Sequence, residues 1–237
     1  MNEDSNIIWR YIDFTKFVSL LDRSALFFAR ADKFKDQFEG SWTKKNFERM
    51  TTALKDVDVL GANYIREFFK KLKEYTYINC WHLSAEESAA LWKLYLKSDE
   101  GIAIRSTLSH LNSELKRNYK KNDLHISKVK YINYKTYNMR EGDILAPFIH
   151  KRTSFIHEKE VRAIIQPLPF KDGTIDLNLK APEDGIYINV DPNVIIDMVY
   201  VSPDAQQWFK DLVESILKKY GLSKVVKRSS LSDDPIF

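Results

Sequence analysis

The chain has 237 residues, 44% hydrophobic and 30% charged, a balance typical of a globular protein that buries a sizeable core. Its net charge of +4 permits an anionic ligand but is milder than that of most nucleic-acid binders, and one cysteine excludes an internal disulfide and a cysteine-based zinc site. No apolar run reaches the roughly 20 residues that span a bilayer, and the start MNEDSN is unlike a signal peptide, so we expect a cytoplasmic protein without membrane contact.

The N-terminal part of the chain predicts alternating strands and helices. Asp13 and Thr15 are placed to cap the first helix, whose apolar residues recur at helical spacing. A loop rich in Asp, Lys and Phe then leads into two further helices and a third apolar run. The expected strands are 7–12, 25–29 and 76–83, and the expected helices are 14–23, 44–55 and 59–74.

The rest of the chain continues the same alternation. Ser84 is a good N-cap, and Glu86 and Glu87 complement the dipole of the helix that follows. An apolar face between 204 and 220, stopped by Gly221, predicts the clearest helix of the chain. The expected elements are helices 87–98 and 204–220, strands 101–105, 125–134, 161–165, 198–201 and 225–229, and a hairpin of 173–179 with 185–190.

The pattern indicates a single α+β domain over residues 1–237, with a helical insertion at about 43–75. The chain shows no internal repeat, no low-complexity tract and no linker-like segment. The oligomeric state is not indicated by the pattern.

The stretch 148–166 concentrates charged residues directly before an apolar segment. Alternation along a strand places Glu158, Glu160 and Arg162 on one face, with Val161 and Ala163 on the other. Such a row is either a solvated charged face or one side of a ligand pocket.

A second cluster of charge lies between 112 and 130. It is usually a solvated helix face and loop, but interleaved tyrosines also fit a nucleic-acid surface. Its cations are Lys116, Arg117, Lys120, Lys121, Lys128 and Lys130.

Several kinds of chemistry lack their motifs. The chain has no G-x-S-x-G, no Walker loop and no G-x-G-x-x-G, which removes the corresponding hydrolase, ATP and Rossmann-type readings. Cys80 and His82 share a strand face but are a weak metal signal, so we expect no metal. Among the remaining residues, an arginine such as Arg10 can clamp a diphosphate, and a carboxylate such as Glu160 can stabilise an oxocarbenium-like ribose.

Four segments of the chain together resemble a prokaryotic family named domain of unknown function 2971. They are WRYIDF, LFFARADKFKDQFEG, NCWHLSAEESAALWKLYLKSDEGIAI and KRTSFIHEKEVRAI, and VYVSPDAQQWF fits as well. The chain departs from the family pattern at Lys35, Gln37 and Leu94, where asparagine, proline and histidine are usual. A role for that histidine is therefore not expected here.

The order of these segments also looks like the ADP-ribosyltransferase superfamily. That resemblance implies a mixed, mostly antiparallel split sheet flanked by helices, and an intracellular toxin or phage-defence effector that uses NAD as a substrate. Arg10 on an early strand, Ser106 or Tyr95 in the middle, and Glu160 late in the chain would take the family's three roles, with Arg10 and Glu160 catalytic. The expected ligand contacts are Tyr11, Glu39, Trp81, Ser84, Trp92, Tyr95, Ser106, Lys151, Arg152, Glu158 and Arg162.

Two functions with a ligand site remain open from the sequence, beside a regulatory or interaction protein that has no such site. The first is NAD-dependent ADP-ribosyl transfer or glycohydrolysis on a small-molecule nucleotide, with nucleic acid as an alternative acceptor. The second is a nucleotide- or nucleic-acid-binding module without catalysis, which would use Arg152 and the cations around Lys116. Convergence in one concave pocket of Arg10, Trp92, Glu158, Glu160 and Arg162 would favour a small-ligand site.

Overall fold

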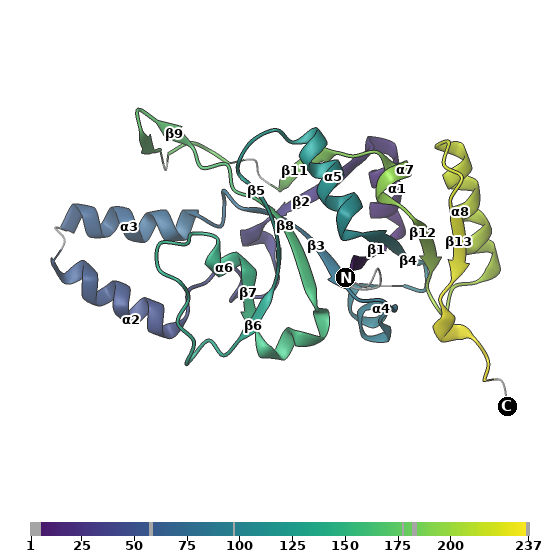
Figure 1. Ribbon diagram of the computed structural model, residues 1–237, viewed down its shortest axis with the longest axis horizontal. Coiled ribbons are helices and arrows are strands. Elements are labelled where there is room, and N and C mark those ends of the chain that lie inside the picture. Colours follow the sequence, from purple (N-terminus) through teal and green to yellow (C-terminus); the bar gives the residue numbers. More distant parts are fainter. Residues whose placement is uncertain (1–5, 57–58, 97, 177, 182–183, 236–237) are drawn as a thin grey trace.

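The computed structural model describes residues 6–56, 59–96, 98–176, 178–181 and 184–235, and Figure 1 shows their arrangement. The helices are α1 (Phe14–Arg23), α2 (Lys44–Ala53), α3 (Val59–Lys71), α4 (Ala89–Tyr95), α5 (Leu108–Asn118), α6 (Ala146–Ile149), α7 (Pro192–Ile195) and α8 (Gln207–Lys219), with the 3-10 turns η2 (Ala31–Lys33), η3 (Leu54–Asp56), η4 (Thr153–Glu158) and η5 (Ser230–Ser232). The strands are β1 (Ile7–Asp13), β2 (Ala25–Arg30), β3 (Tyr77–Leu83), β4 (Gly101–Thr107), β5 (Leu124–Lys128), β6 (Lys130–Ile132), β7 (His150–Arg152), β8 (Glu160–Ile165), β9 (Phe170–Lys171), β10 (Thr174–Ile175), β11 (Gly185–Asn189), β12 (Met198–Val201) and β13 (Val225–Arg228). This is the predicted α+β architecture, a mixed sheet flanked by helices.

The large sheet divides at β3. Its strands follow the order β11-β2-β3-β1-β4-β12-β13, while β8 pairs with β3 and carries β5 on its outer edge. β8 runs antiparallel along one edge of β3 from Tyr77 to His82. The other edge is shared, because β2 pairs at Tyr77 and Ile78 whereas β1 pairs at His82 and Leu83. The predicted split of the sheet is therefore the gap between β1 and β2.

One face of the sheet carries the main apolar core. Helix α1 buries Phe17 and Leu21 there, and its start is fixed because the Asp13 side chain accepts a hydrogen bond from the Lys16 amide. Helix α8 adds Phe209 and Val213 to the same core, four residues apart on one helix face. Gly221 follows α8 with φ +75, a conformation open to glycine, which confirms the predicted stop.

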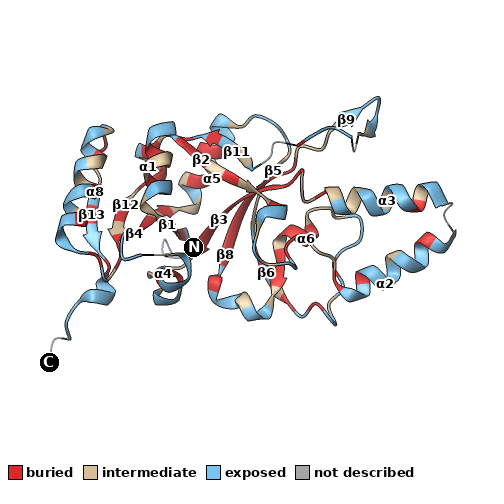
Figure 2. Cartoon of the chain, turned by 180° about the vertical axis from the view of Figure 1, so that it is seen from behind, coloured by how far each residue is buried: buried red, intermediate tan, exposed pale blue. Residues whose placement is uncertain are grey.

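The opposite face is covered by smaller clusters. α4 packs Leu91 and Trp92 against Trp9 and Tyr11 of β1. Further along, residues from α3, α6 and the loop after η2 pack around Phe148 over β3 and β8. Burial in Figure 2 follows these layers, with red concentrated along β3 and β8.

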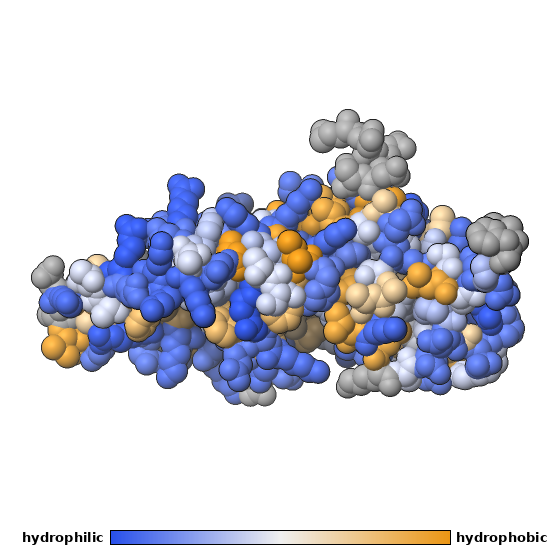
Figure 3. All heavy atoms as spheres, turned by 90° about the horizontal axis from the view of Figure 1, so that it is seen from below, coloured by the Kyte–Doolittle hydropathy of each residue, from blue (hydrophilic) through white to orange (hydrophobic). Residues whose placement is uncertain are grey.

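The α2–α3 pair projects from one end of the molecule, far from α8 (Figure 1). It falls within the expected insertion at 43–75. Asn46 and Ala62 are the buried residues described in these two helices, and Figure 2 shows both helices largely exposed. Hydrophilic residues predominate on the side of the molecule seen in Figure 3. No helix within the described ranges is both long and apolar enough to cross a bilayer.

One predicted hairpin and one predicted continuous strand are wrong. Segments 173–179 and 185–190 do not form a hairpin, because β10 pairs with β9 across a tight turn in which Asp172 and Gly173 both have positive φ. β11 instead covers the edge of β2, where its Ile188 becomes buried. The expected strand 125–134 is divided into β5 and β6, and β6 pairs in parallel with β7 outside the large sheet.

The start of the helix expected at 87–98 also differs. Helix α4 begins at Ala89, and its N-cap is Ser88, whose side chain accepts from the Leu91 amide. Ser84 instead accepts a hydrogen bond from the Glu86 amide through its hydroxyl and from the Trp9 indole through its carbonyl. Two serines four residues apart offered equally good caps, and packing of Trp92 on β1 selects the later one.

Candidate active site

A sharp turn brings two carboxylates to the start of β8. η4 ends at Glu158, Lys159 takes the left-handed conformation with φ 39, and β8 begins at Glu160. The turn directs both carboxylates inward, so Glu158 and Glu160 are buried while Lys159 is exposed. The prediction placed Glu158 on the strand itself, which is wrong, because the strand starts two residues later.

Lys151 of β7 bridges the two carboxylates. Its Nζ donates to Glu158 Oε2 at 2.5 Å and to Glu160 Oε1 at 2.7 Å. The parallel pairing of β7 with β6, which sets Tyr131 beside Lys151, fixes the backbone at this point. The Tyr131 hydroxyl also accepts a hydrogen bond from the Glu160 amide at 2.8 Å. β6 therefore holds the backbone of both Lys151 and Glu160, the two partners of this ion pair.

Arg162 continues the network on the same face of β8, as alternation predicts. Its Nε donates to Glu160 Oε2 at 2.7 Å, and Nη1 and Nη2 bind the two oxygens of Glu39 at 2.5 and 3.0 Å. Nη1 also donates to the carbonyl of Phe148 at 2.7 Å. The Arg162 side chain is fully buried, so the alternative of a solvated charged face is wrong for this strand.

Glu39 reaches this network from the loop that follows η2. The loop turns at Gly40, which has φ +63, and a Cβ atom there would lie 2.5 Å from Cε1 of the Phe148 ring. Only glycine fits both the conformation and the space. The segment DQFEG therefore places Glu39 against Arg162 from a position more than a hundred residues away in the chain.

The charges of this cluster do not cancel when every group is ionised. Three carboxylates (Glu39, Glu158, Glu160) face two cations (Lys151, Arg162) in a buried region. One proton on a carboxylate would make the cluster neutral, and low polarity around it favours that state. These five groups are therefore neutral as a set when they hold one proton.

The pKa shifts indicate where that proton resides. Burial, together with the neighbouring Glu160 carboxyl, raises the pKa of Glu158 to about 7 against the opposing effect of Lys151. Burial also acts to raise the pKa of Glu160, but Arg162 and Lys151 outweigh it and hold that pKa well below the usual range. Glu160 is thus the ionised carboxylate, and Glu158 is the one that takes the proton near neutral pH.

Aromatic side chains from β1 and α4 border the cluster. The Tyr11 ring meets Trp92 edge-on at 5.1 Å and lies 6.3 Å from the His82 ring, and both Tyr11 and Trp92 are buried. The Tyr95 side chain differs, because 47% of the residue is exposed while burial and the charge of Glu158 raise the pKa of its hydroxyl. Of these three aromatic groups, Tyr95 is therefore the one that a ligand can reach, whereas Tyr11 and Trp92 are buried.

Arg10 lies in the split of the sheet. Its Nη2 donates to the Phe27 carbonyl of β2 at 3.5 Å, and its guanidinium stacks on Trp81 with 5.7 Å between Cζ and the ring centroid. Burial lowers the pKa of Arg10 to about 10, and Nη1 is buried without a hydrogen-bond partner. Strand alternation puts Arg10 and Trp81 toward the main core, whereas Glu160 lies on the opposite face, so the structure does not bring Arg10 and Glu160 together.

Three other expected contacts also lie apart from the carboxylates. Ser106 is fully buried on β4 opposite Ile8, on the side of the main core. Ser84 follows β3 and is engaged with the backbone as described above. Arg152 pairs with Asp36 at 2.8 Å and is flanked by the rings of Phe38 and Phe155, so it borders the network without joining it.

The sequence prediction missed two groups at this site. His82 lies opposite Glu160 in the β3–β8 pairing, its Nδ1 is 2.7 Å from the Glu158 carbonyl oxygen, and burial lowers its pKa. Tyr131 supports the Glu160 backbone as described. The sequence did contain a signal for His82, because alternation along the strand places it on the same face as Cys80. Tyr131 reaches the site only through the pairing of β6 with β7, which no local sequence pattern indicates.

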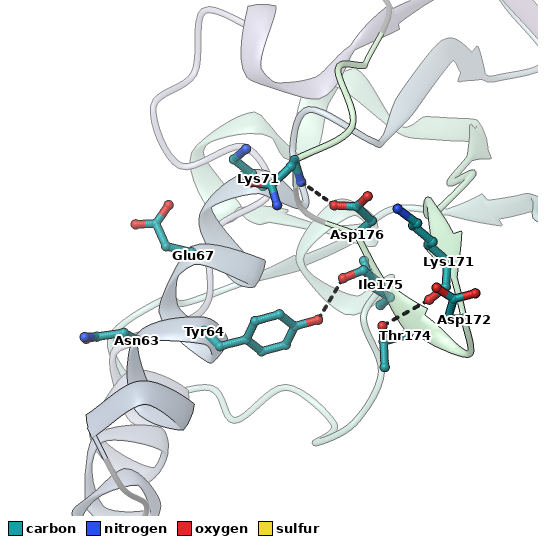
Figure 4. Close-up of a pocket in the computed structure, with 10 residues that line it drawn as sticks. Asn63, Tyr64, Glu67, Lys71, Lys171, Asp172, Thr174, Ile175 and Asp176 are labelled. Carbon is teal, nitrogen blue, oxygen red and sulfur yellow. Dashed lines mark hydrogen bonds between the residues drawn. The ribbon is translucent and has the colours of Figure 1, made fainter.

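Two cavities lie away from this cluster. A cavity of about 660 Å³ opens between α3 and the β9–β10 hairpin, where the Tyr64 hydroxyl donates to the Ile175 carbonyl (Figure 4). A smaller one of about 320 Å³ lies beside α2, next to Trp42 and Phe69. Within the described ranges, no group of three or more His, Cys, Asp or Glu residues is arranged to hold a metal ion.

Comparisons with known proteins give matches in fold only. No family model and no curated protein matches the chain, so the resemblance to domain of unknown function 2971 stays a prediction. Three structures of DarT from Thermus sp. 2.9 are similar over nearly the whole length. The complex with ADP-ribosylated single-stranded DNA has 9% identity, 97% coverage of both chains and a TM-score of 0.44. The NAD+ complex has 8% identity, covers 97% of this chain and 98% of its own, and has a TM-score of 0.45. The carba-NAD+ complex has 9% identity, covers 96% of this chain and 97% of its own, and has a TM-score of 0.40.

Proposed function

We propose that this protein uses NAD as a substrate in ADP-ribosyl transfer or glycohydrolysis, with Glu160 as the catalytic carboxylate. The observation that carries the proposal is the buried position of Glu160 between the cations of Arg162 and Lys151, which hold its pKa well below the usual range. When the bond between ribose and nicotinamide breaks, positive charge develops on the ribose. A fixed carboxylate in surroundings of low polarity stabilises that charge far better than one in water.

The strand arrangement supports the same proposal. The resemblance to the ADP-ribosyltransferase superfamily implies an early strand, a middle strand and a late strand that carries the glutamate. β1, β3 and β8 lie side by side in that order. The middle strand is then β3 and not β4, so we assign the middle position to Tyr95, which borders β3, in preference to Ser106.

Tyr95 is the proposed stacking surface for the nicotinamide or the adenine. Its ring is half exposed, and it ends α4 directly above the carboxylates whose charges affect its hydroxyl. Stacking on such a ring contributes about 1–3 kcal/mol per base. Glu160 is itself only 5% exposed, so side chains that cover it must move before a substrate can reach it.

In this proposal Arg10 does not have the catalytic, diphosphate-binding role that the sequence predicted. The unpartnered Nη1 is closed to solvent within the split. Contact with a diphosphate therefore requires β1 and β2 to part. We assign Arg10 first to holding the split, through Phe27 and Trp81.

Nucleic acid is the second candidate ligand, and it would act as acceptor or as a bound partner. The edge strand β5 favours it, because exposed cations precede, accompany and follow this strand, and β5 ends beside the start of β8. The Val129 amide after β5 donates to the Glu160 carbonyl. NAD+ and single-stranded DNA are also ligand classes named for the DarT structures. The exposed cations are Lys116, Arg117, Lys120, Lys121, Lys128 and Lys130.

The products distinguish these possibilities. Incubation with NAD should release nicotinamide together with free ADP-ribose if the reaction is hydrolysis, and with an ADP-ribosylated oligonucleotide if nucleic acid is the acceptor. Glu160→Gln should abolish both, whereas Glu214→Gln, at a half-exposed glutamate on α8, should abolish neither. Oligonucleotide binding that weakens steeply with salt, without any NAD consumption, would replace this proposal by the binding-module alternative.

A further inference from the structure

We propose that Lys151 is a positioning residue that acts through the two carboxylates it bridges: it keeps Glu160 ionised and assigns the shared proton to Glu158. This inference rests on the proposed function of Glu160. It also replaces the earlier expectation that Lys151 contacts the ligand, because only 10% of the side chain is exposed and its ammonium is already engaged.

The surroundings of the ammonium leave little room for another partner. Glu158 and Glu160 accept hydrogen bonds from two of its three N–H groups, at 2.5 and 2.7 Å. The ring of Phe155 lies over Nζ with 4.5 Å to the centroid, and an aromatic face attracts a cation there. Lys151 is thus held between two carboxylates and an aromatic ring.

The position of Lys151 decides which carboxylate carries the proton. Glu160 contacts both cations of the cluster, Glu39 contacts Arg162 through both oxygens, and Glu158 contacts Lys151 alone. Glu158 therefore loses least when it is protonated. Without Lys151, three carboxylates would face one cation, and a second proton would have to enter the cluster at Glu160.

One further cation reaches the cluster, because Lys73 interacts electrostatically with Glu39, and burial lowers the pKa of Lys73. Among the described residues, Lys151 and Arg162 are the cations that contact Glu158 and Glu160. Burial raises the pKa values of the Tyr131, Tyr95 and Cys80 side chains, and burial lowers that of His82, so all four are neutral near pH 7. Lys159 and His157 stand outside on the exposed turn. Among the described residues, the groups that face Glu158 and Glu160 are Lys151, Arg162, Glu39, Cys80, His82, Tyr95 and Tyr131.

Carboxyl-labelled glutamate observed by NMR tests this inference without any substrate. The wild-type protein should show one buried carboxyl that titrates near neutral pH and disappears in Glu158→Gln. In Lys151→Gln a second carboxyl, that of Glu160, should also begin to titrate near neutral pH. Its signal is assigned by its absence from Glu160→Gln spectra. Lys151→Arg should restore the wild-type pattern. A Lys151→Gln spectrum in which Glu160 stays ionised throughout would overturn the inference.

Lys159→Gln is the matched control, since Lys159 lies on the same turn but is exposed. It should leave both titrations unchanged. If Lys151→Gln does not fold, the wild-type protein decides by itself: the Lys151 ammonium should remain protonated at higher pH than an exposed lysine, because its carboxylate partners outweigh burial. Deprotonation of Lys151 at an ordinary or lower pH would contradict the proposal.

Catalysis gives a second, separate readout. If NAD is consumed, Lys151→Gln should lower kcat by more than about tenfold and move its pH dependence, with KM for NAD little changed and Lys151→Arg largely active. A rise in KM with unchanged kcat would mean that Lys151 contacts the ligand after all. If no variant consumes NAD, the proposed function fails, but the NMR titrations still decide the role of Lys151.

Discussion

Replacement of Glu158 by glutamine should change the stability of the protein relative to wild type in a way that depends on pH. The variant should gain stability over wild type as the pH rises from acidic to alkaline. Glutamine has nearly the same shape as glutamic acid and carries no charge at any pH. The wild-type protein must bury an ionised Glu158 above neutral pH, in a cluster that already contains two other carboxylates. The variant does not.

The magnitude follows from the pKa of Glu158, which burial raises from 4.5 to about 7. The folded state binds a proton that the unfolded state has lost between these values, so this contribution to stability is fully present below pH 4.5 and lost as pH rises through about 7. Each pKa unit corresponds to about 1.4 kcal/mol, and partial screening by solvent reduces the total to about 1–2 kcal/mol.

Urea unfolding of both proteins at about pH 5 and about pH 8.5 measures this effect. The free energy of unfolding of Glu158→Gln, relative to wild type, should increase by about 1–2 kcal/mol between the two pH values. Glu214→Gln, on the surface of α8 beside Lys210, serves as the control and should show no such change. Parallel pH profiles for wild type and Glu158→Gln would refute the reasoning.

Three further changes test the surroundings of the cluster. Arg162→Met should destabilise the fold by about 3–5 kcal/mol in urea unfolding, because Glu39 and Glu160 lose their buried partner. Gly40→Ala should cost about 1–3 kcal/mol in the same assay, since its φ of +63 and its approach to Phe148 leave no place for a methyl group; an unchanged midpoint would argue against a tight turn. Tyr95→Ala should raise KM for NAD by about tenfold with a stability change below about 1 kcal/mol, because its ring is half exposed; Tyr64→Ala, equally exposed on α3, should leave KM unchanged.

Local patterns in the sequence predicted most elements of the fold. The spacing of apolar residues and the position of Gly221 predicted α8 to within a few residues. Alternation predicted that Glu160 and Arg162 share one face of β8. These features depend on near neighbours in the chain, which is why periodicity reveals them.

The parts that failed depend on contacts between distant segments. The prediction could not show that Glu39 binds Arg162 from across the chain, and that contact makes the charged face a buried one. The sequence prediction placed Arg10 with Glu160. In the structure, Arg10 lies between β1 and β2 and contacts Phe27 and Trp81 instead. Strand order alone gives adjacency of β1, β3 and β8 but not the face on which a side chain lies.

The rate of nicotinamide release from NAD tests the central claim most directly. With wild type, Glu160→Gln and Glu214→Gln measured side by side near neutral pH, we expect release by wild type and by Glu214→Gln. Loss of the carboxylate should reduce kcat for Glu160→Gln by about a hundredfold or more, while the NAD dissociation constant changes little. Equal release by Glu160→Gln and wild type, or no release by a folded wild-type protein with any acceptor, would contradict the assignment of Glu160 as the catalytic carboxylate.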